Sequence, residues 1–345
     1  IALAAAAAGC AGGTTPQAGT AATPPTTLPC VRPALATAAA GPPLGAQRIA
    51  AGPDGGLWFV EKDGNAIGRI GTDGCVRTYP LPTAASSPFD IAAGPDGNMW
   101  FTEFEGGNIG RITPQGTIRQ FSIPTPGSGP RGIAAGPGGA MWFTEYAMVR
   151  VARITMSGTV SEVPYPHAGN HPGGIVAGSD GNVWFTQSGP DAGIGRVTPA
   201  GDLTQLPLPG AVSDAEGQSP MIAAGPDGNL WLAEPGTGSV ARMVPGGTGT
   251  TFALPTAGSG PEGITAGPDG ALWFTERTAG RIGRITTAGA VSEYPLPSAG
   301  SQPSGITTGP DHALWFTESG ANRIGRITTA GAMTEFALPA PGASP

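Results

Sequence analysis

The 345-residue sequence has little charge and little histidine. Charged residues make up 12% of the chain, and 24 acidic against 17 basic side chains give a formal net charge of −7. No block of basic residues occurs, and nucleic-acid binding needs clustered Lys and Arg that displace counterions, so we expect no nucleic-acid partner. The only histidines are His167, His171 and His312, which leaves little material for Ser-His-Asp chemistry.

The sequence also lacks a long apolar run. The longest, Ile1 to Ala8, is far shorter than the roughly 20 residues that span a bilayer. Residues 1–10 are typical of the end of a secretory signal peptide, and Ala7-Ala8-Gly9-Cys10 is similar to a bacterial lipoprotein box with Cys10 as the lipidated residue. We therefore expect an exported protein, secreted or held at the bacterial cell envelope by this lipid alone. An ordinary secretory signal with an incidental cysteine is the alternative.

Residues 11–43 consist mainly of Ala, Thr, Pro and Gly, and Arg32 is their single charged residue. Such a segment buries too little apolar area to offset its ordering entropy, so it predicts a disordered, flexible tether. The other two cysteines are Cys30 and Cys75. Exported proteins form disulfides, but equivalent positions on neighbouring repeats are expected to exceed the Cα separation of about 7 Å that a bridge allows. The spacing disfavours a bridge and leaves the question open.

Glycine and proline are abundant, with 59 and 38 residues, and without a period this would indicate a low-complexity chain. A period exists. Every tryptophan occupies the same place in one unit, and successive tryptophans are 42 residues apart except for one spacing of 47, at positions 58, 100, 142, 184, 231, 273 and 315. This period is typical of four-stranded propeller blades.

Each unit contains four short apolar runs bounded by turn residues, which predicts four strands; around Trp273 they cover 263–266, 272–276, 282–286 and 291–296. The second run is continuously apolar, as expected for a strand packed on both faces. We predict an all-β, seven-bladed β-propeller of four-stranded antiparallel blades over residues 44–340, monomeric, with a tail at 341–345. A strand beginning at Cys30 or the last repeat's own Met333–Phe336 would complete the ring.

Two side chains recur in the units. One is a Glu three places after the Trp, and the other is an Arg in the third strand, which all seven units contain. A need common to every blade, such as an ion pair or a capping hydrogen bond, explains them best; the alternative is that one or two of the acids bind a cation or ligand. The Asp of the Gly-Pro-Asp-Gly turns is interpreted as a turn former bonded to its own backbone.

The repeated Trp-Phe-Thr-Glu, Ile-Gly-Arg-Ile-Thr and Glu-Tyr-Pro-Leu-Pro resemble the virginiamycin B lyase (streptogramin B lyase) family over about residues 44–340. The resemblance implies a carbon–oxygen lyase that opens a cyclic depsipeptide by elimination across its ester, with Mg²⁺ and a His general base. It places a Glu and that His on either side of Pro303, a second Glu after Trp315, and a substrate-binding His after Pro261.

This chain departs from that pattern. Gln302 and Ser304 stand at the Glu and His positions, Glu262 stands at the substrate-binding His position, and only the metal-ligand position Glu318 is matched. No other blade supplies the base, because the residues after the corresponding prolines are Phe89, Arg131, Gly173, Met221, Glu262 and Ser304. His171, beside Pro172, would need a rearranged site; solvated loop histidines are the simpler interpretation.

Antiparallel blades bring the start of each first strand and the end of each second strand to one face. The residues there that differ between blades are our candidate ligand-binding residues: Phe89, Asp90, Arg131, Glu262 and Ser304. The 47-residue spacing adds an insertion at 210–219 with Asp214 and Glu216, and loop insertions at the rim of a rigid scaffold commonly build sites. We expect a small molecule or protein to bind this face without elimination chemistry; a Mg²⁺-dependent lyase or hydrolase with displaced catalytic residues is the alternative.

Overall fold

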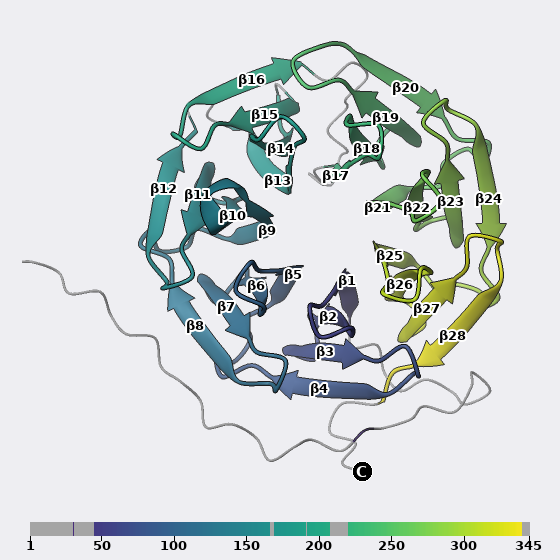
Figure 1. Ribbon diagram of the computed structural model, residues 1–345, viewed down its shortest axis with the longest axis horizontal. Coiled ribbons are helices and arrows are strands. Elements are labelled where there is room, and N and C mark those ends of the chain that lie inside the picture. The colour runs from purple at the N-terminus through teal and green to yellow at the C-terminus, as the bar shows by residue number, and fades with distance from the viewer. Residues whose placement is uncertain (1–29, 31–44, 166–168, 191, 208–219, 340–345) are drawn as a thin grey trace, which may run out of the picture.

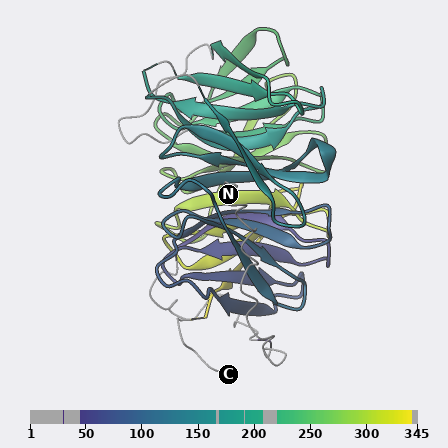
Figure 2. The same ribbon diagram turned by 90° about the vertical axis from the view of Figure 1, so that its left-hand side faces the viewer.

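The computed structural model describes residues 30, 45–165, 169–190, 192–207 and 220–339. Its strands form seven four-stranded antiparallel sheets placed around a ring (Figure 1), so the predicted all-β, seven-bladed propeller is confirmed. Viewed edge-on the ring is a flat disc (Figure 2). The described residues contain no helix that is long and apolar enough to cross a membrane.

Each blade consists of four strands that are consecutive in the chain, with the first innermost and the fourth on the rim. A single 3-10 turn, η1 (Pro137–Gly139), joins the first two strands of blade 3. The strands of blades 1 to 7, in chain order, are β1 (Ala46–Ala51), β2 (Leu57–Glu61), β3 (Ala66–Ile70), β4 (Val76–Pro80); β5 (Pro88–Ala93), β6 (Met99–Glu103), β7 (Asn108–Ile112), β8 (Ile118–Ser122); β9 (Pro130–Gly136), β10 (Ala140–Glu145), β11 (Arg150–Ile154), β12 (Val160–Pro164); β13 (His171–Ala177), β14 (Val183–Ser188), β15 (Gly193–Val197), β16 (Leu203–Pro207); β17 (Met221–Ala224), β18 (Leu230–Glu234), β19 (Ser239–Met243), β20 (Gly249–Ala253); β21 (Pro261–Ala266), β22 (Leu272–Glu276), β23 (Arg281–Ile285), β24 (Val291–Pro295); and β25 (Pro303–Thr308), β26 (Leu314–Glu318), β27 (Arg323–Ile327), β28 (Met333–Ala337).

The ring closes with the strand of the last repeat. β28 pairs with β27, and Cys30 lies in no strand. Of the two ways of completing the ring, the structure therefore uses the C-terminal strand. No strand is exchanged between the first and last blades, which meet through β1 against β25 and β26.

A disulfide joins Cys30 to Cys75, with their Cα atoms 5.5 Å apart. The expectation of a longer separation was wrong because it treated Cys30 as part of a repeat. Cys30 instead precedes the first blade, and its position is not tied to that of a neighbouring blade. Cys75 stands directly before the rim strand β4, where a segment from outside the ring can reach it.

The core lies between blades. In blade 6, Trp273 packs against Leu314 and Phe316 of the next blade, whereas Phe274 packs against Trp231 of the preceding one. Every residue of the second strand is buried, which confirms the two-sided packing predicted from its apolar run. All seven tryptophans are at most 1% exposed, and burial of side chains of this size dominates the stability of the fold.

In every blade except the third, where the turn carries no Asp, a repeated Asp anchors the tryptophan from the opposite face of the disc, and the repeated Arg lies over its ring. In blade 6, Asp269 Oδ1 accepts a hydrogen bond from Trp273 Nε1 at 3.0 Å and from the backbone N–H of Ala271 at 3.4 Å. The other oxygen, Oδ2, accepts from Arg284 Nε at 2.7 Å, and the guanidinium lies 5.9 Å from the Trp273 ring. The Asp thus holds its own turn, as predicted, and also binds the indole and the Arg. The repeated Arg has the structural role that its recurrence indicated.

A second contact links neighbouring inner strands. Thr275 Oγ1 donates to the carbonyl of Ser304 in the next blade at 2.7 Å and accepts from Gly263 N at 2.8 Å. The corresponding Thr317 donates to the carbonyl of Gln47 at 2.6 Å and so joins the last blade to the first. The inner strands approach so closely that a Cβ on Gly263 would lie 2.3 Å from the Ser304 carbonyl oxygen. Glycine is required there, and few side chains can stand near the axis.

We expect Asp269→Ala to lower the free energy of unfolding by about 2 kcal/mol, because the buried indole N–H of Trp273 loses its acceptor. Urea denaturation followed by tryptophan fluorescence measures this change. The matched control is Asp202→Ala, which removes an exposed carboxylate and should change stability by less than about 0.5 kcal/mol. Equal effects of the two substitutions would contradict the anchoring role.

Candidate functional site

The candidate site lies on the face where inner strands begin and second strands end. Two positions per blade reach it: the residue after the proline that stands at the start of the inner strand in blades 2 to 7, and the residue that follows the repeated Glu. Successive side chains of a strand alternate between its two sides. At the next residue of the inner strand, the close approach of the neighbouring inner strand leaves no room for a large side chain in most blades. Differences between blades at these two positions therefore set the chemistry of the face.

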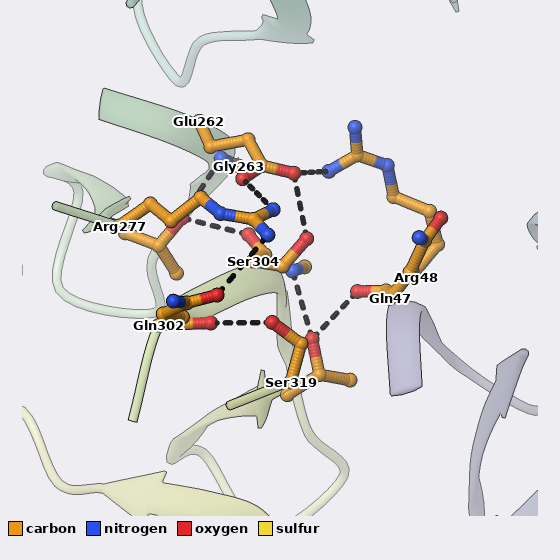
Figure 3. Close-up of polar contacts among 11 residues, drawn as sticks. Gln47, Arg48, Glu262, Gly263, Arg277, Gln302, Ser304 and Ser319 are labelled. Atoms are coloured by element: carbon orange, nitrogen blue, oxygen red, sulfur yellow. Dashed lines mark hydrogen bonds and ion pairs between the residues drawn. The ribbon is translucent and has the colours of Figure 1, made fainter. Parts of the chain in front are cut away.

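In blades 6 and 7 these positions form a network of charges with Arg48, the third residue of β1 in blade 1, and Gln302, which precedes β25 (Figure 3). Ser304 Oγ donates to Glu262 Oε1 at 2.7 Å, and Arg48 Nη1 lies 3.4 Å from the same oxygen. Arg277 Nη1 donates to Glu262 Oε2 at 3.0 Å, while its Nη2 donates to Gln302 Oε1 at 3.3 Å. Burial raises the pKa of Glu262, but the two guanidinium groups and the Ser304 hydroxyl outweigh it and lower that pKa below its ordinary value. Glu262 is thus a partly buried, ionised carboxylate with its oxygens already engaged.

Asp90, in blade 2, is a second partly buried carboxylate beside this network. Its Oδ1 accepts the backbone N–H of Ile91 at 2.9 Å and its Oδ2 that of Ile133 in blade 3 at 3.1 Å. Burial raises the pKa of Asp90, and the positive charges of Arg48 and Arg131 oppose the increase. The role of Asp90 here is to hold the inner strands of blades 2 and 3 together under the face.

Blades 2 and 3 carry an aromatic pocket of about 290 Å³. The Arg131 guanidinium lies between two rings, 4.9 Å from the centroid of Phe89 and 4.8 Å from that of Tyr146. Phe104 lies between the same two residues, with centroid distances of 6.4 Å to Phe89 and 6.3 Å to Tyr146. We name this cavity the Arg131 pocket; it is lined by Lys62, Ser87, Phe89, Phe104, Glu105, Arg131 and Tyr146.

His171 extends this aromatic cluster and is not a solvated loop residue, which corrects the simpler sequence interpretation. It begins β13, its ring stacks on Tyr146 at 4.6 Å, and its Nδ1 lies 2.8 Å from the Tyr146 carbonyl oxygen. Five of the predicted ligand-binding residues are thus described: Phe89 and Arg131 line the pocket, Asp90 lies beneath the face, and Glu262 and Ser304 belong to the charge network. Cys10, His167, Asp214 and Glu216 lie outside the described residues.

Sequence reasoning missed half of the site. Lys62, Phe104 and Tyr146 in the pocket, and Arg277 in the network, all directly follow the repeated Glu of their blades. The signal was present, since this position shares the face and varies from blade to blade. Arg48 was missed for another reason: the first repeat begins without the usual proline, so its inner strand was harder to align.

Comparisons with known proteins agree with the fold and the repeat. The family model "Virginiamycin B lyase family" matches residues 34–215 and 210–345. The chain belongs to the virginiamycin B lyase family. The solved virginiamycin B lyase of Staphylococcus aureus is 34% identical, with a TM-score of 0.76, covering 88% of this chain and 97% of that one. A catalytically inactive variant of the S. aureus enzyme, solved with quinupristin, is 33% identical with the same TM-score, covering 89% and 98%.

A curated virginiamycin B lyase of Bordetella bronchiseptica is 51% identical over 43 residues, which is 12% of this chain and 14% of that protein. The chain therefore spans about one-seventh of the length of the curated relatives it matches. This stretch is about as long as one 42-residue repeat. This local similarity thus concerns the blade as a structural unit.

The positions that the resemblance assigns to the family's reaction lie together where β25 begins and β26 ends. Glu318 stands opposite Pro303 in the register of β25 and β26, so Gln302 and Ser304 flank it as the resemblance implies. Gln302 accepts from Arg277, and Ser304 donates to Glu262. This donor set does not suit Mg²⁺, because the side-chain oxygen of Gln302 already accepts from Arg277 and the carboxylate of Glu318 is buried inside its blade. Among the described residues no group of three or more His, Cys, Asp or Glu side chains could hold a metal ion.

Glu318 itself is buried inside its blade. Burial and the nearby charge of Glu335 raise the pKa of Glu318 to about 8, with Arg323 opposing. The equivalent Glu276 in blade 6 has a pKa raised to about 7, by burial and then by the charge of Glu293. At neutral pH the repeated Glu is therefore largely protonated in blade 7 and about half protonated in blade 6, and its burial in both blades agrees with a structural role.

We expect Glu276→Gln to stabilise the fold increasingly as the pH rises. The pKa of Glu276 is higher in the folded state, about 7, than the ordinary value of 4.5, so ionisation favours the unfolded chain. The difference in free energy of unfolding between variant and parent should be small below pH 4.5, grow to about 3 kcal/mol by pH 7, and then level off. Urea denaturation at pH 4, 6 and 8 measures it; the exposed Glu105→Gln serves as control, and a pH-independent difference would contradict the argument.

Proposed function

We propose that this protein is an exported member of the virginiamycin B lyase family that binds a ligand on the face described above and does not perform the family's elimination. The observation that carries the proposal is the network around Glu262. Ser304 and Gln302 occupy the positions of the general base and of one metal ligand, and their polar atoms are engaged with Glu262 and Arg277.

The chemistry of the missing base supports binding over catalysis. Removing a proton next to a carbonyl at neutral pH needs an accessible group with a pKa near 7. The Ser304 hydroxyl is 1% exposed and points at a carboxylate whose pKa is lowered, so it has no activating base. Glu318 has a raised pKa but is 0% exposed, and a substrate proton cannot reach it.

A second candidate is a lyase or hydrolase with displaced catalytic residues. His171 favours it, because this histidine lies in the same aromatic cluster as Arg131. A histidine can accept a proton at neutral pH, and an arginine can stabilise a developing oxyanion. This candidate would place the reaction in blades 3 and 4, away from the family positions in blade 7.

The test is incubation of the purified protein with a streptogramin B antibiotic, with and without Mg²⁺. Liquid chromatography with mass spectrometry separates the outcomes, since elimination gives a ring-opened isomer of unchanged mass and hydrolysis adds one water. We expect no product from this protein, while the S. aureus virginiamycin B lyase, as positive control, opens the ring. Product that disappears in Glu318→Ala would restore the family chemistry, and product that disappears only in His171→Ala would establish the displaced site.

Export remains part of the proposal and is supported by the disulfide between Cys30 and Cys75, because disulfides persist in oxidising compartments. In a bacterial host that processes lipoproteins we expect radiolabelled palmitate to be incorporated into the full-length protein and lost in Cys10→Ala. Alkylation followed by mass spectrometry should leave both bridged cysteines unmodified until a reductant is added. Labelling that persists in Cys10→Ala would contradict the lipid anchor.

A further inference from the structure

We infer that the Arg131 pocket binds a small planar aromatic carboxylate, with the Arg131 guanidinium as the anion-binding group. The inference rests on the proposed function, since it specifies the ligand class for the same face. It depends on how the pocket combines fixed positive charge with aromatic surface.

The guanidinium of Arg131 is held in place before any ligand arrives. Phe89 and Tyr146 lie against it at 4.9 and 4.8 Å, one ring from blade 2 and one from blade 3. Arginine is planar and offers paired N–H donors that match the two oxygens of a carboxylate. A side chain restrained by two rings loses less entropy on binding than a free one, which favours recognition at this point.

The charge of the pocket favours an anion over a cation. Aromatic faces ordinarily attract cations, but here a cation of the protein itself, Arg131, already lies over the faces of Phe89 and Tyr146. Lys62 adds a second positive charge to the lining, against the single negative charge of Glu105. Beneath the pocket, Asp90 is engaged by two backbone N–H groups. A cationic ligand would meet repulsion, whereas a carboxylate would find two cations.

The remaining walls suit one aromatic ring. Phe104 is tilted by 41° against Phe89 and by 52° against Tyr146, so the three rings form a concave apolar surface next to the guanidinium. A volume of about 290 Å³ is at the small end for ligand pockets, and fits a single substituted ring better than a macrocycle.

Blades 6 and 7 have no such arrangement. At the two equivalent positions blade 6 has Glu262 and Arg277, and blade 7 has Ser304 and Ser319, which are joined into the charge network. The two sectors therefore differ in kind: in one the charged side chains bind one another, and in the other the Arg131 guanidinium lies between aromatic walls beside a cavity. This asymmetry places the ligand off the axis of the ring.

The experiment titrates the full-length protein with benzoate, its neutral analogue benzamide and the cation benzylamine, followed by ligand-observed saturation-transfer NMR. We expect benzoate to bind at least tenfold more tightly than benzamide, and benzylamine to bind most weakly. Arg131→Gln should weaken benzoate at least tenfold and remove its advantage over benzylamine, because the two ring faces become available to a cation. Arg131→Lys should retain part of the benzoate affinity.

The matched control is Arg119→Gln. Arg119 lies over the Phe121 ring at 4.9 Å, the same kind of contact, but on the rim strand β8 and outside the pocket. The Arg119→Gln substitution should leave benzoate binding unchanged. Circular dichroism of each variant checks folding; if Arg131→Gln does not fold, Lys62→Gln replaces it, with an expected loss of at least threefold.

Three results would overturn the inference: equal binding of benzoate and benzamide, benzoate binding that survives Arg131→Gln, or no binding of any probe. The streptogramin assay separates this failure from failure of the proposed function. Tighter binding of benzylamine than of benzoate would contradict an anionic ligand but would still be consistent with a face that binds ligands. Only ring-opened product in the streptogramin assay would contradict the proposed binding function itself.

Discussion

Each blade can bury its tryptophan only against the next blade, and the rest of the structure depends on this constraint. A single four-stranded sheet has two apolar faces and no partner for either, so the repeat acquires a core only when neighbours stack and the ring closes. In blade 6, Trp273 faces forward and Phe274 faces backward, and Thr275 adds a hydrogen bond to the neighbouring inner strand. The 42-residue period in the sequence is the consequence.

Closing seven blades around one axis crowds their inner strands, and this crowding decides where function can reside. Gly263 cannot be replaced by a larger residue without a clash with the next backbone, so the freedom to vary is confined to the adjacent inner-strand position and to the residue after the repeated Glu. Blades 1 and 2 depart further, since Arg48 and Asp90 stand where blade 6 has this glycine. Those two charged side chains connect the two sectors of the face.

The scaffold of the family persists here, while Gln302 and Ser304 stand where the resemblance implies the residues of its reaction. They flank Pro303, which lies opposite Glu318 in the strand register, and nearby Arg48 and Arg277 supply the positive charge that balances Glu262. A repeated scaffold tolerates such replacement because its stability comes from the interfaces between blades. Fold similarity alone therefore does not carry the activity of the relatives to this chain.

The sequence by itself determined the fold, because the tryptophan period, the turn residues and the doubly apolar second strand are local signals that repeat seven times. It also identified Phe89, Arg131, Glu262 and Ser304, since these break the repeat on a face that strand direction predicts. Only the tertiary structure decided that Phe89 and Arg131 belong to a pocket with Tyr146, that Glu262 pairs with Arg48, 214 positions away, and that Cys30 bonds to Cys75. These contacts join residues that share no local sequence pattern. Closure of the ring sets how far apart such residues lie in space.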